Sequence, residues 1–274
     1  MTDCILLIGH GSREEGGNEE IRRFAELLAE RRPDWQLETC FIEFADPLLK
    51  EGLDRAAARA ERVIAVPLIL NAAGHVKLEV PEQLEAARAR HPQVAFRLAR
   101  HLGVSEAMLG LLERRLREGM QALAMPDPRT TGVIVLGRGS SDRAANGEVA
   151  RLARWLYEGA EHELVDIAFT GVTHPRLEAV VRRHERLGAT QQIVIPYYLY
   201  TGRLIARIGE QVARLRGQYP RTAFALTDYL GFEPEIFELL EQRVSEAVAG
   251  AGMLECDGCP HRAAAAHHHH HHHH

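Results

Sequence analysis

Residues 5–15 read ILLIGHGSREE, and residues 133–143 read VIVLGRGSSDR. Both stretches run from an apolar segment into a glycine, a basic residue, a second glycine and a serine. An apolar run that ends at glycines and is followed by an amphipathic segment is typical of a buried parallel strand that leads into a helix. The two copies differ at the basic residue, which is His10 in the first and Arg138 in the second.

The likeness continues at an offset of about 128 residues. Pro47 matches Pro175, and the run VIAVPLILNAAGH at 63–75 matches IVIPYYLYTGR at 193–203. The matches keep their order over about 100 residues, and the period is too long for a solenoid. The sequence therefore predicts two similar domains in tandem.

Each copy alternates short apolar runs with longer amphipathic segments. In the first copy the pattern predicts strands at 4–8, 36–43, 62–70 and 94–99, and helices at 18–32, 47–60, 79–90 and 105–118. Strands that alternate with helices pair in parallel and form a doubly wound sheet. The expected fold class is α/β, with two tandem, similar, doubly wound domains.

The predicted organisation has five parts. They are an N-terminal catalytic domain (1–120), a linker (121–131), a degenerate second domain (132–250), a tail with a C-x-x-C motif (251–262) and an alanine linker with a histidine tag (263–274). A natural metal-binding histidine tract is the alternative for the last part.

The composition excludes several classes of protein. The chain has 274 residues, of which 46% are apolar and 26% charged, and its net charge is -5 with neutral histidines. This balance does not favour nucleic acid or an acidic membrane as a partner. We expect no signal peptide and no membrane span. Four cysteines do not make a disulfide framework, so we expect a cytoplasmic protein.

Candidate reactive side chains follow three predicted strands of the first copy. His10 follows the first strand, Glu43 the second and His75 the third. Ligands of open parallel sheets bind at the carboxyl ends of the strands, so these side chains are expected at one edge. Two imidazoles and a carboxylate suit a divalent metal such as Co, Fe, Ni or Zn, and they can accept protons near neutral pH.

The second copy has lost both histidines and kept the neighbouring glycines. Arg138 replaces His10, and Arg203 replaces His75. Arginine cannot act as a base at physiological pH, but it holds carboxylates well. This predicts a reactive first domain and a substrate-binding second domain. The alternative is that both histidines only form hydrogen bonds in their loops.

Three segments carry a resemblance to a known family. They are LLIGHGSR near the start, CFIEFADPLL at 40–49 and VPLILNAAGHVKLEVPEQL at 66–84. They resemble the class II chelatases of tetrapyrrole biosynthesis, and specifically the long-form sirohydrochlorin cobaltochelatases of the CbiX family, over about residues 5–259. The resemblance implies two α/β domains that face each other across a cleft. It also implies insertion of a divalent metal into a metal-free macrocycle without ATP, here in cobalamin biosynthesis.

The resemblance also implies roles for residues. His10 and His75 match the family's active-site histidines and would hold the incoming Co²⁺, with one of them acting as the base. Glu43 matches the family's carboxylate and would orient an imidazole or pass a proton on. Because sirohydrochlorin is an octacarboxylate, cationic side chains should surround it. The candidates for binding it are Arg13, Lys77, Arg138 and Arg203, with Ser12 as a helix cap or a carboxylate ligand.

The two cysteines near the C-terminus leave two expectations open. Cys256 and Cys259 form the C-x-x-C motif, and two thiolates alone do not complete a zinc or iron–sulfur site. Long-form cobaltochelatases carry a similar motif, in some members with an iron–sulfur cluster. A [4Fe–4S] cluster with further ligands from a second chain is one expectation, and free thiols in the tail are the other. Cys4 and Cys40 fall in predicted strands and are expected to be buried.

Several functional alternatives stay open. The same ligand types bind Co, Fe and Ni, so a ferrochelatase for siroheme or a nickel chelatase fits the same residues. A metal carrier or sensor that uses His10 and His75 only for binding is the non-enzymatic alternative. A histidine phosphatase is disfavoured because Gly9, and not an arginine, precedes His10. The chain is expected to be a monomer or a homodimer.

Overall fold

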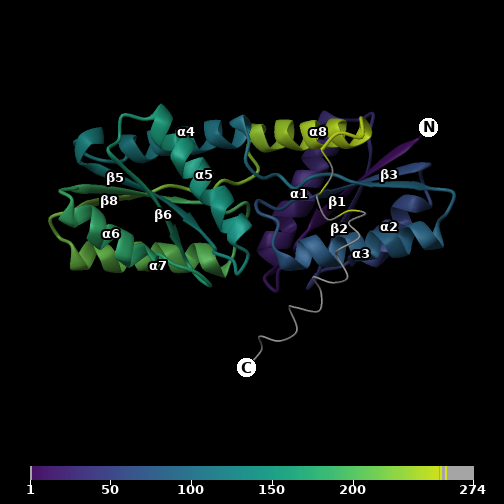
Figure 1. Ribbon diagram of the computed structural model, residues 1–274, viewed down its shortest axis with the longest axis horizontal. Coiled ribbons are helices and arrows are strands. Elements are labelled where there is room, and N and C mark those ends of the chain that lie inside the picture. The colour runs from purple at the N-terminus through teal and green to yellow at the C-terminus, as the bar shows by residue number, and fades with distance from the viewer. Residues whose placement is uncertain (1, 253, 255–256, 258–274) are drawn as a thin grey trace, which may run out of the picture. The chain divides into compact units, whose positions relative to one another are not determined.

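A computed structural model describes residues 2–252, 254 and 257, with the side chain of His75 outside the described part (Figure 1). The strands form two four-stranded sheets, with the orders β2-β1-β3-β4 and β6-β5-β7-β8. All neighbouring strands in both sheets run parallel. The prediction of two tandem α/β domains with parallel sheets is confirmed.

The elements alternate along the chain in the predicted manner. The first repeat contains β1 (Asp3–Gly9), α1 (Glu15–Arg31), β2 (Gln36–Phe41), α2 (Leu49–Ala57), β3 (Arg62–Pro67), α3 (Gly74–Arg90), β4 (Ala95–Leu98) and α4 (Glu106–Gln121). The second contains β5 (Thr131–Gly137), α5 (Arg143–Gly159), β6 (Leu164–Phe169), α6 (Leu177–Arg186), β7 (Gln191–Pro196), α7 (Arg203–Gln218), β8 (Ala223–Leu226) and α8 (Pro234–Val248). Among the described residues no helix combines the length and apolar character needed to cross a bilayer.

The central strands are buried along almost their whole length. All seven residues of β5 are buried, and in β1 only Asp3 is partly exposed. This explains the unbroken apolar runs in the sequence, because a strand covered on both faces needs no polar side. Within the first sheet, Ile8 pairs with Cys40 of β2 and with Pro67 of β3, which aligns the carboxyl ends of the three strands.

The strand order reverses between β1 and β3. From β1 the chain moves to one side to form β2, and it then returns past β1 to form β3 and β4. The loops that leave β1 and β3 therefore diverge at this point, and in open α/β sheets the crevice between such loops is where ligands bind. His10 is the first residue after β1.

The sequence predicted a loop position for His75, but the structure places this residue in a helix. β3 already ends at Pro67, and α3 begins at Gly74, so His75 is the second residue of that helix. The expected helix began only at 79, whereas the observed helix is Gly74–Arg90 and includes Pro81. His75 remains on the carboxyl side of β3, since α3 starts there.

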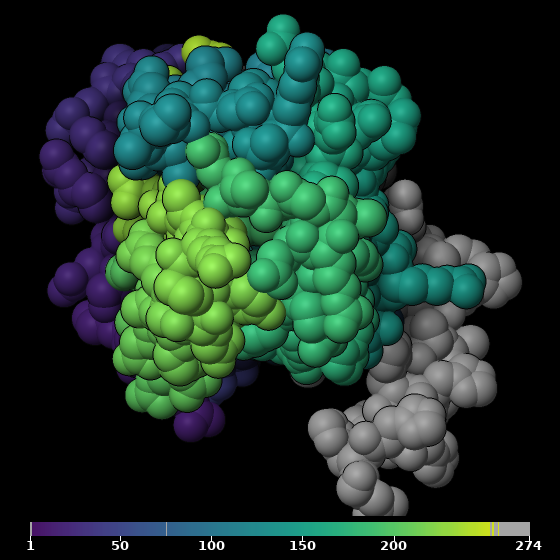
Figure 2. Space-filling model, turned by 90° about the vertical axis from the view of Figure 1, so that its left-hand side faces the viewer, coloured from purple at the N-terminus to yellow at the C-terminus, as the bar shows by residue number. Residues whose placement is uncertain are grey.

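The compact units differ from the predicted domain boundaries. One unit comprises the described residues up to Leu102 together with those from Leu240 onward, and the other comprises Gly103–Leu239. Helix α4 thus belongs with the second sheet, where it packs on β7, β8 and α5, and most of α8 belongs with the first. The two repeats have exchanged their last helices. In Figure 2 the teal, green and yellow-green colours mark the residues of the second unit.

Candidate active site

His10 and Glu43 lie together at the carboxyl edge of the first sheet. The Nδ1 atom of His10 is 3.5 Å from Oε1 of Glu43 and 3.4 Å from the carbonyl oxygen of Gly11. The His10 side chain is 26% exposed and that of Glu43 is 45% exposed. Both groups are therefore open to a ligand while they remain close to each other.

Two loops hold this pair in place. Gly11 has a φ of +89°, and a Cβ atom built on it would lie 1.7 Å from the carbonyl oxygen of Glu43. The amide of Glu43 donates to the carbonyl of His10 at 3.1 Å. Only glycine allows this backbone conformation and this close approach. The loop after β1 is thus packed backbone to backbone against the loop after β2.

The second repeat has the same loops with different side chains. Gly139 has a φ of +86°, its added Cβ would lie 2.2 Å from the carbonyl oxygen of Gly171, and the Gly171 amide donates to Arg138 at 2.9 Å. Arg138 stands in place of His10, and Gly171 in place of Glu43. Sequence reasoning noticed the lost histidine and missed the lost carboxylate, although the same offset of 128 residues shows both.

The contacts of His10 determine which ring nitrogen is available. A carbonyl oxygen can only accept a hydrogen bond, so the contact with Gly11 assigns the proton to Nδ1. Nε2 of the neutral ring then carries a lone pair that can bind a cation or accept a proton. A nearby carboxylate that stabilises the protonated ring is the arrangement found behind many metal-binding histidines. Glu43 is placed to act in this way.

The placement of His75 rests on its backbone alone. It belongs to the first turn of α3, at the same edge of the sheet as His10, and β1 and β3 are neighbours in that sheet. Its side chain lies outside the described part of the structure. Among the described side chains, no group of three or more His, Cys, Asp or Glu residues could hold a metal ion.

Arg13 and Phe44 form a further exposed pair beside this site. The guanidinium carbon of Arg13 lies 4.8 Å from the centre of the Phe44 ring, which is a cation–π contact. Phe44 follows Glu43 directly, has a φ of +62° and is 49% exposed. Arg13 was predicted from the sequence and Phe44 was not, because the only signal for Phe44 was an aromatic residue in the loop after the carboxylate.

Ser12 orders the turn that precedes α1. Its hydroxyl accepts a hydrogen bond from the Glu14 amide at 3.1 Å, and the buried Asn18 bonds both its amide and its carbonyl. The N-cap position belongs to Glu14, so Ser12 is not the cap itself. Ser140 makes the same set of bonds in the second repeat.

The other expected substrate ligands also follow strands. Lys77 lies in the first turn of α3, Arg203 begins α7, and the exposed Arg138 follows β5 directly. Beside Arg138, the hydroxyl of Tyr198 lies 2.6 Å from Oγ1 of Thr170. Burial raises the pKa of Tyr198, and the bond with Thr170 and the charge of Arg138 offset this only in part. Tyr198 therefore stays a neutral hydrogen-bonding group.

Cys256 and Cys259 lie outside the described residues. Cys4 and Cys40 are free thiols buried in the first sheet, as expected, and burial raises the pKa of both, for Cys4 to about 11. With these two in the core, one chain offers only the two tail thiols, whereas a [4Fe–4S] cluster takes four. The cysteines of a single chain therefore do not fit such a cluster.

Comparisons with known proteins agree with the duplicated fold. The family model for CbiX matches residues 4–119 and 132–247, which are the two repeats. The chain belongs to the CbiX family. It is 37% identical over 263 residues to a sirohydrochlorin cobaltochelatase from Priestia megaterium, covering 94% of this chain and 84% of that protein.

This CbiX-family chain also resembles ferrochelatases. It is 28% identical to a sirohydrochlorin ferrochelatase from Priestia megaterium over 251 residues, covering 91% of this chain and 92% of that protein. The solved structure of SirB from Bacillus subtilis with Fe³⁺ has a TM-score of 0.79 and 28% identity, covering 91% of this chain and 97% of that one. This CbiX chain is thus similar both to a cobaltochelatase and to ferrochelatases.

Proposed function

We propose that the chain inserts a divalent metal into sirohydrochlorin without ATP, and that the metal is Co²⁺, for cobalamin biosynthesis. The observation that carries this proposal is the pairing of His10 with Glu43 at the reversal of strand order in the first repeat. The second repeat has the same loops and neither side chain. Membership of the CbiX family supports the same conclusion.

Metal insertion requires groups that release the ion and accept protons. The ion must lose its water, reach four inward nitrogens of the macrocycle and displace two pyrrole protons. In this proposal Nε2 of His10 and the ring of His75 hold the ion loosely. After the transfer, His10 accepts one pyrrole proton and solvent water takes the second, and Glu43 stabilises the resulting imidazolium at its Nδ1 side.

Recognition of the macrocycle is assigned to the surrounding edge residues. The exposed ring of Phe44, with Arg13 over it, offers an apolar face and a positive charge side by side. That combination suits a flat macrocycle with carboxylate arms. We assign further carboxylate contacts to Ser12, Lys77, Arg138 and Arg203, all at the carboxyl edges of the sheets.

The choice of cobalt rests on the relative with the higher identity. The cobaltochelatase from Priestia megaterium is 37% identical, and the ferrochelatase from the same organism 28%. Imidazole and carboxylate bind Co²⁺, Fe²⁺ and Ni²⁺ alike, so geometry at His10 does not discriminate. Insertion rates for the three ions, measured in competition on metal-free sirohydrochlorin, test the cobalt assignment.

The experiment that tests the activity follows the absorbance of anaerobic sirohydrochlorin after Co²⁺ is added. We expect the wild type to accelerate the change, and His10→Ala to lower kcat by about 100-fold or more, the usual contribution of a positioned proton acceptor. Arg138→Ala, at the equivalent position of the second repeat, should instead raise KM. A His10→Ala variant with normal turnover would refute the role of His10. Tight Co²⁺ binding without acceleration would favour a metal carrier.

A further inference from the structure

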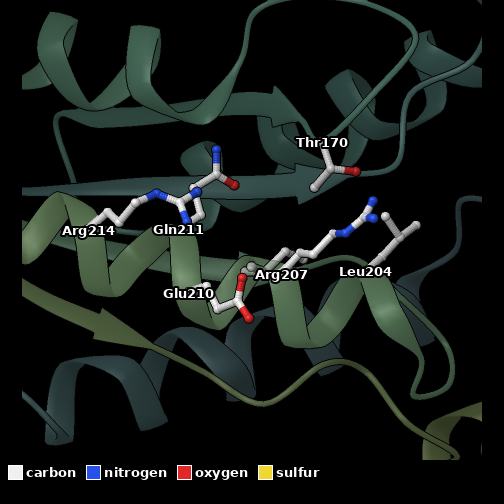
Figure 3. A pocket seen from close by; sticks show the side chains of 7 residues that line it. Thr170, Leu204, Arg207, Glu210, Gln211 and Arg214 are labelled. Carbon is white, nitrogen blue, oxygen red and sulfur yellow. The ribbon is translucent and has the colours of Figure 1, made fainter.

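A concave site lies in the second unit, beside helix α7. It has a volume of about 330 Å³, and six of its seven lining residues belong to the first three turns of α7. The seventh is Thr170, the first residue after β6. Figure 3 shows Arg207, Gln211 and Arg214 projecting from successive turns of the helix, with Thr170 at the end of a strand.

This pocket is continuous with the carboxyl edge of the second sheet. Oγ1 of Thr170 lies 3.4 Å from the carbonyl oxygen of Arg138 and 2.6 Å from the hydroxyl of Tyr198. Arg138 is the residue that replaces His10. The pocket therefore begins at the position that corresponds to the reactive edge of the first repeat, and it extends from there along α7.

The first repeat provides an internal comparison. At the positions of Arg207, Glu210, Gln211 and Arg214, helix α3 carries Glu79, Glu82, Gln83 and Ala86. Thr170 corresponds to Ile42. The charged side chains at these helix positions thus sum to one positive charge in the second repeat and to two negative charges in the first. Gln83 and Gln211 are equivalent in the two helices. The more positive charge of α7 at these positions comes from Arg207 and Arg214, where α3 has no arginine.

The side chains of the pocket suit an anion with planar oxygens. Guanidinium groups bind carboxylates through two parallel hydrogen bonds. Arg207 and Arg214 are exposed, and the amide of Gln211 is held by Glu178. Leu204 and the buried Ile208 supply apolar wall for a methylene arm. Glu210 is the only acidic residue among those that line the pocket, so the lining has a net charge of one positive.

We propose that this pocket binds a carboxylate arm of the tetrapyrrole substrate, with Arg207 and Arg214 as its anchors. The inference rests on the proposed function and deepens it, since it assigns the second repeat a specific part in substrate recognition. The pocket takes no part in proton transfer or metal binding. Its loss should therefore weaken binding of the macrocycle and leave the chemical step unchanged.

The test uses the double variant Arg207→Ala/Arg214→Ala in the full chain. We expect KM for sirohydrochlorin, and the Kd for the metal-free macrocycle from a spectroscopic titration, to rise about tenfold, while kcat stays within about twofold. Arg207→Lys/Arg214→Lys should recover part of the affinity, because the charge is kept and the paired hydrogen bonds are lost. Arg221→Ala is the matched control, since Arg221 is exposed near the amino end of β8.

The outcomes separate the two proposals. If the double variant has the Kd and KM of the wild type, the pocket assignment is wrong and the chelatase assignment stands. If the wild type binds the macrocycle but inserts no metal, the chelatase assignment fails, and the titration still tests the pocket. If Arg221→Ala lost as much affinity for the macrocycle as the double variant, the loss would be explained by net charge alone, and the pocket assignment would be wrong. Melting temperatures of all variants should match, because the substituted side chains are exposed.

Discussion

Arg115 and Arg243 stand 128 positions apart and make the same hydrogen bonds, each to the backbone of the other repeat. Arg115 in α4 donates to the carbonyls of Tyr229 and Leu230, at 3.2 and 3.0 Å. Arg243 in α8 donates to those of His101 and Leu102, at 3.0 and 2.8 Å. Both arginines are buried, and each also pairs with a glutamate three residues later. These contacts fix the exchanged helices in place.

Replacing either arginine with alanine should destabilise the protein by a similar amount. Each change removes one buried and one partly buried hydrogen bond to a carbonyl and also the partner of a glutamate, so we expect the free energy of unfolding to fall by about 2–4 kcal/mol. Urea denaturation measures it. Arg117→Ala, an exposed change on α4, should cost less than about 0.5 kcal/mol. If only one of the two alanine variants were destabilised, Arg115 and Arg243 would not have equivalent roles in holding α4 and α8.

Gly11→Ala and Gly139→Ala should affect stability in the same way but differ in their effect on the rate of metal insertion. Each added Cβ collides with a backbone oxygen at a positive φ, so both variants should lose about 1–3 kcal/mol of stability. Only Gly11→Ala displaces Glu43 from His10, so only this change should greatly reduce the rate of metal insertion. Thermal unfolding and the insertion assay, run on the same preparations, give both quantities.

The control for these glycines is Gly147→Ala in α5. A Cβ at that position meets nothing within 4 Å, and alanine is the better helix former, so stability should rise by about 0.5–1 kcal/mol. If Gly139→Ala reduced kcat as much as Gly11→Ala does, the assignment of the chemistry to the first repeat would be wrong.

Arg88 and Asp257 fasten the described part of the C-terminal tail to the edge strand β4. The guanidinium of Arg88 donates to both oxygens of the buried Asp257 carboxylate at 2.9 Å, and also to the carbonyl of Phe96. The amide of Leu254 donates to Leu98, at 3.3 Å, and its side chain joins the first hydrophobic core. The tail thus covers carbonyls of an edge that would otherwise be open to other strands.

The second repeat supplies the matched control for this anchor. Arg216 makes the same bond to the Phe224 carbonyl, and no bond from it to a carboxylate is found among the described residues. We expect Arg88→Ala to cost about 2–3 kcal/mol and Arg216→Ala about 1 kcal/mol. Hydrogen exchange should show the Leu254 amide losing protection only in Arg88→Ala. Equal effects of the two changes would mean that the tail is not held by this pair.

Asp166 should make the second unit sensitive to acid. Burial raises the pKa of this carboxyl, but the hydrogen bond with His184 at 2.9 Å and the charges of Arg183 and His184 outweigh burial and lower it. A carboxyl with a lowered pKa stabilises the fold above its unfolded value of about 4, and this stabilisation is lost as the pH falls through the folded value. The free energy of unfolding should therefore decline below about pH 4, and less steeply in Asp166→Asn.

Urea denaturation between about pH 3 and pH 7 measures this slope. Glu185→Gln, which removes an exposed carboxyl from the same helix as His184, serves as the control and should keep the wild-type slope. An unchanged slope in Asp166→Asn would show that this carboxyl does not govern the acid response.

The sequence alone predicted the sheets well because their signal is local. Unbroken apolar runs such as 4–8 mark strands covered on both faces, and the repeated glycine motif marks the turns after β1 and β5. The position of Glu43 near His10 followed from parallel pairing. The exchange of α4 and α8 could not be predicted, because the amphipathic pattern of a helix does not say which sheet it covers. The helical position of His75 was missed because the expected helix began only at 79, whereas α3 begins at Gly74.

The exchange of the closing helices has a consequence for any attempt to divide this molecule. A gene cut near codon 125 would yield two polypeptides, each with a complete sheet and with the helix that its counterpart needs. Each polypeptide would lack one of the helices that cover its sheet, whereas the two mixed in equal amounts would complete each other. Duplication has made the halves resemble one another, and the crossed helices have made them mutually dependent.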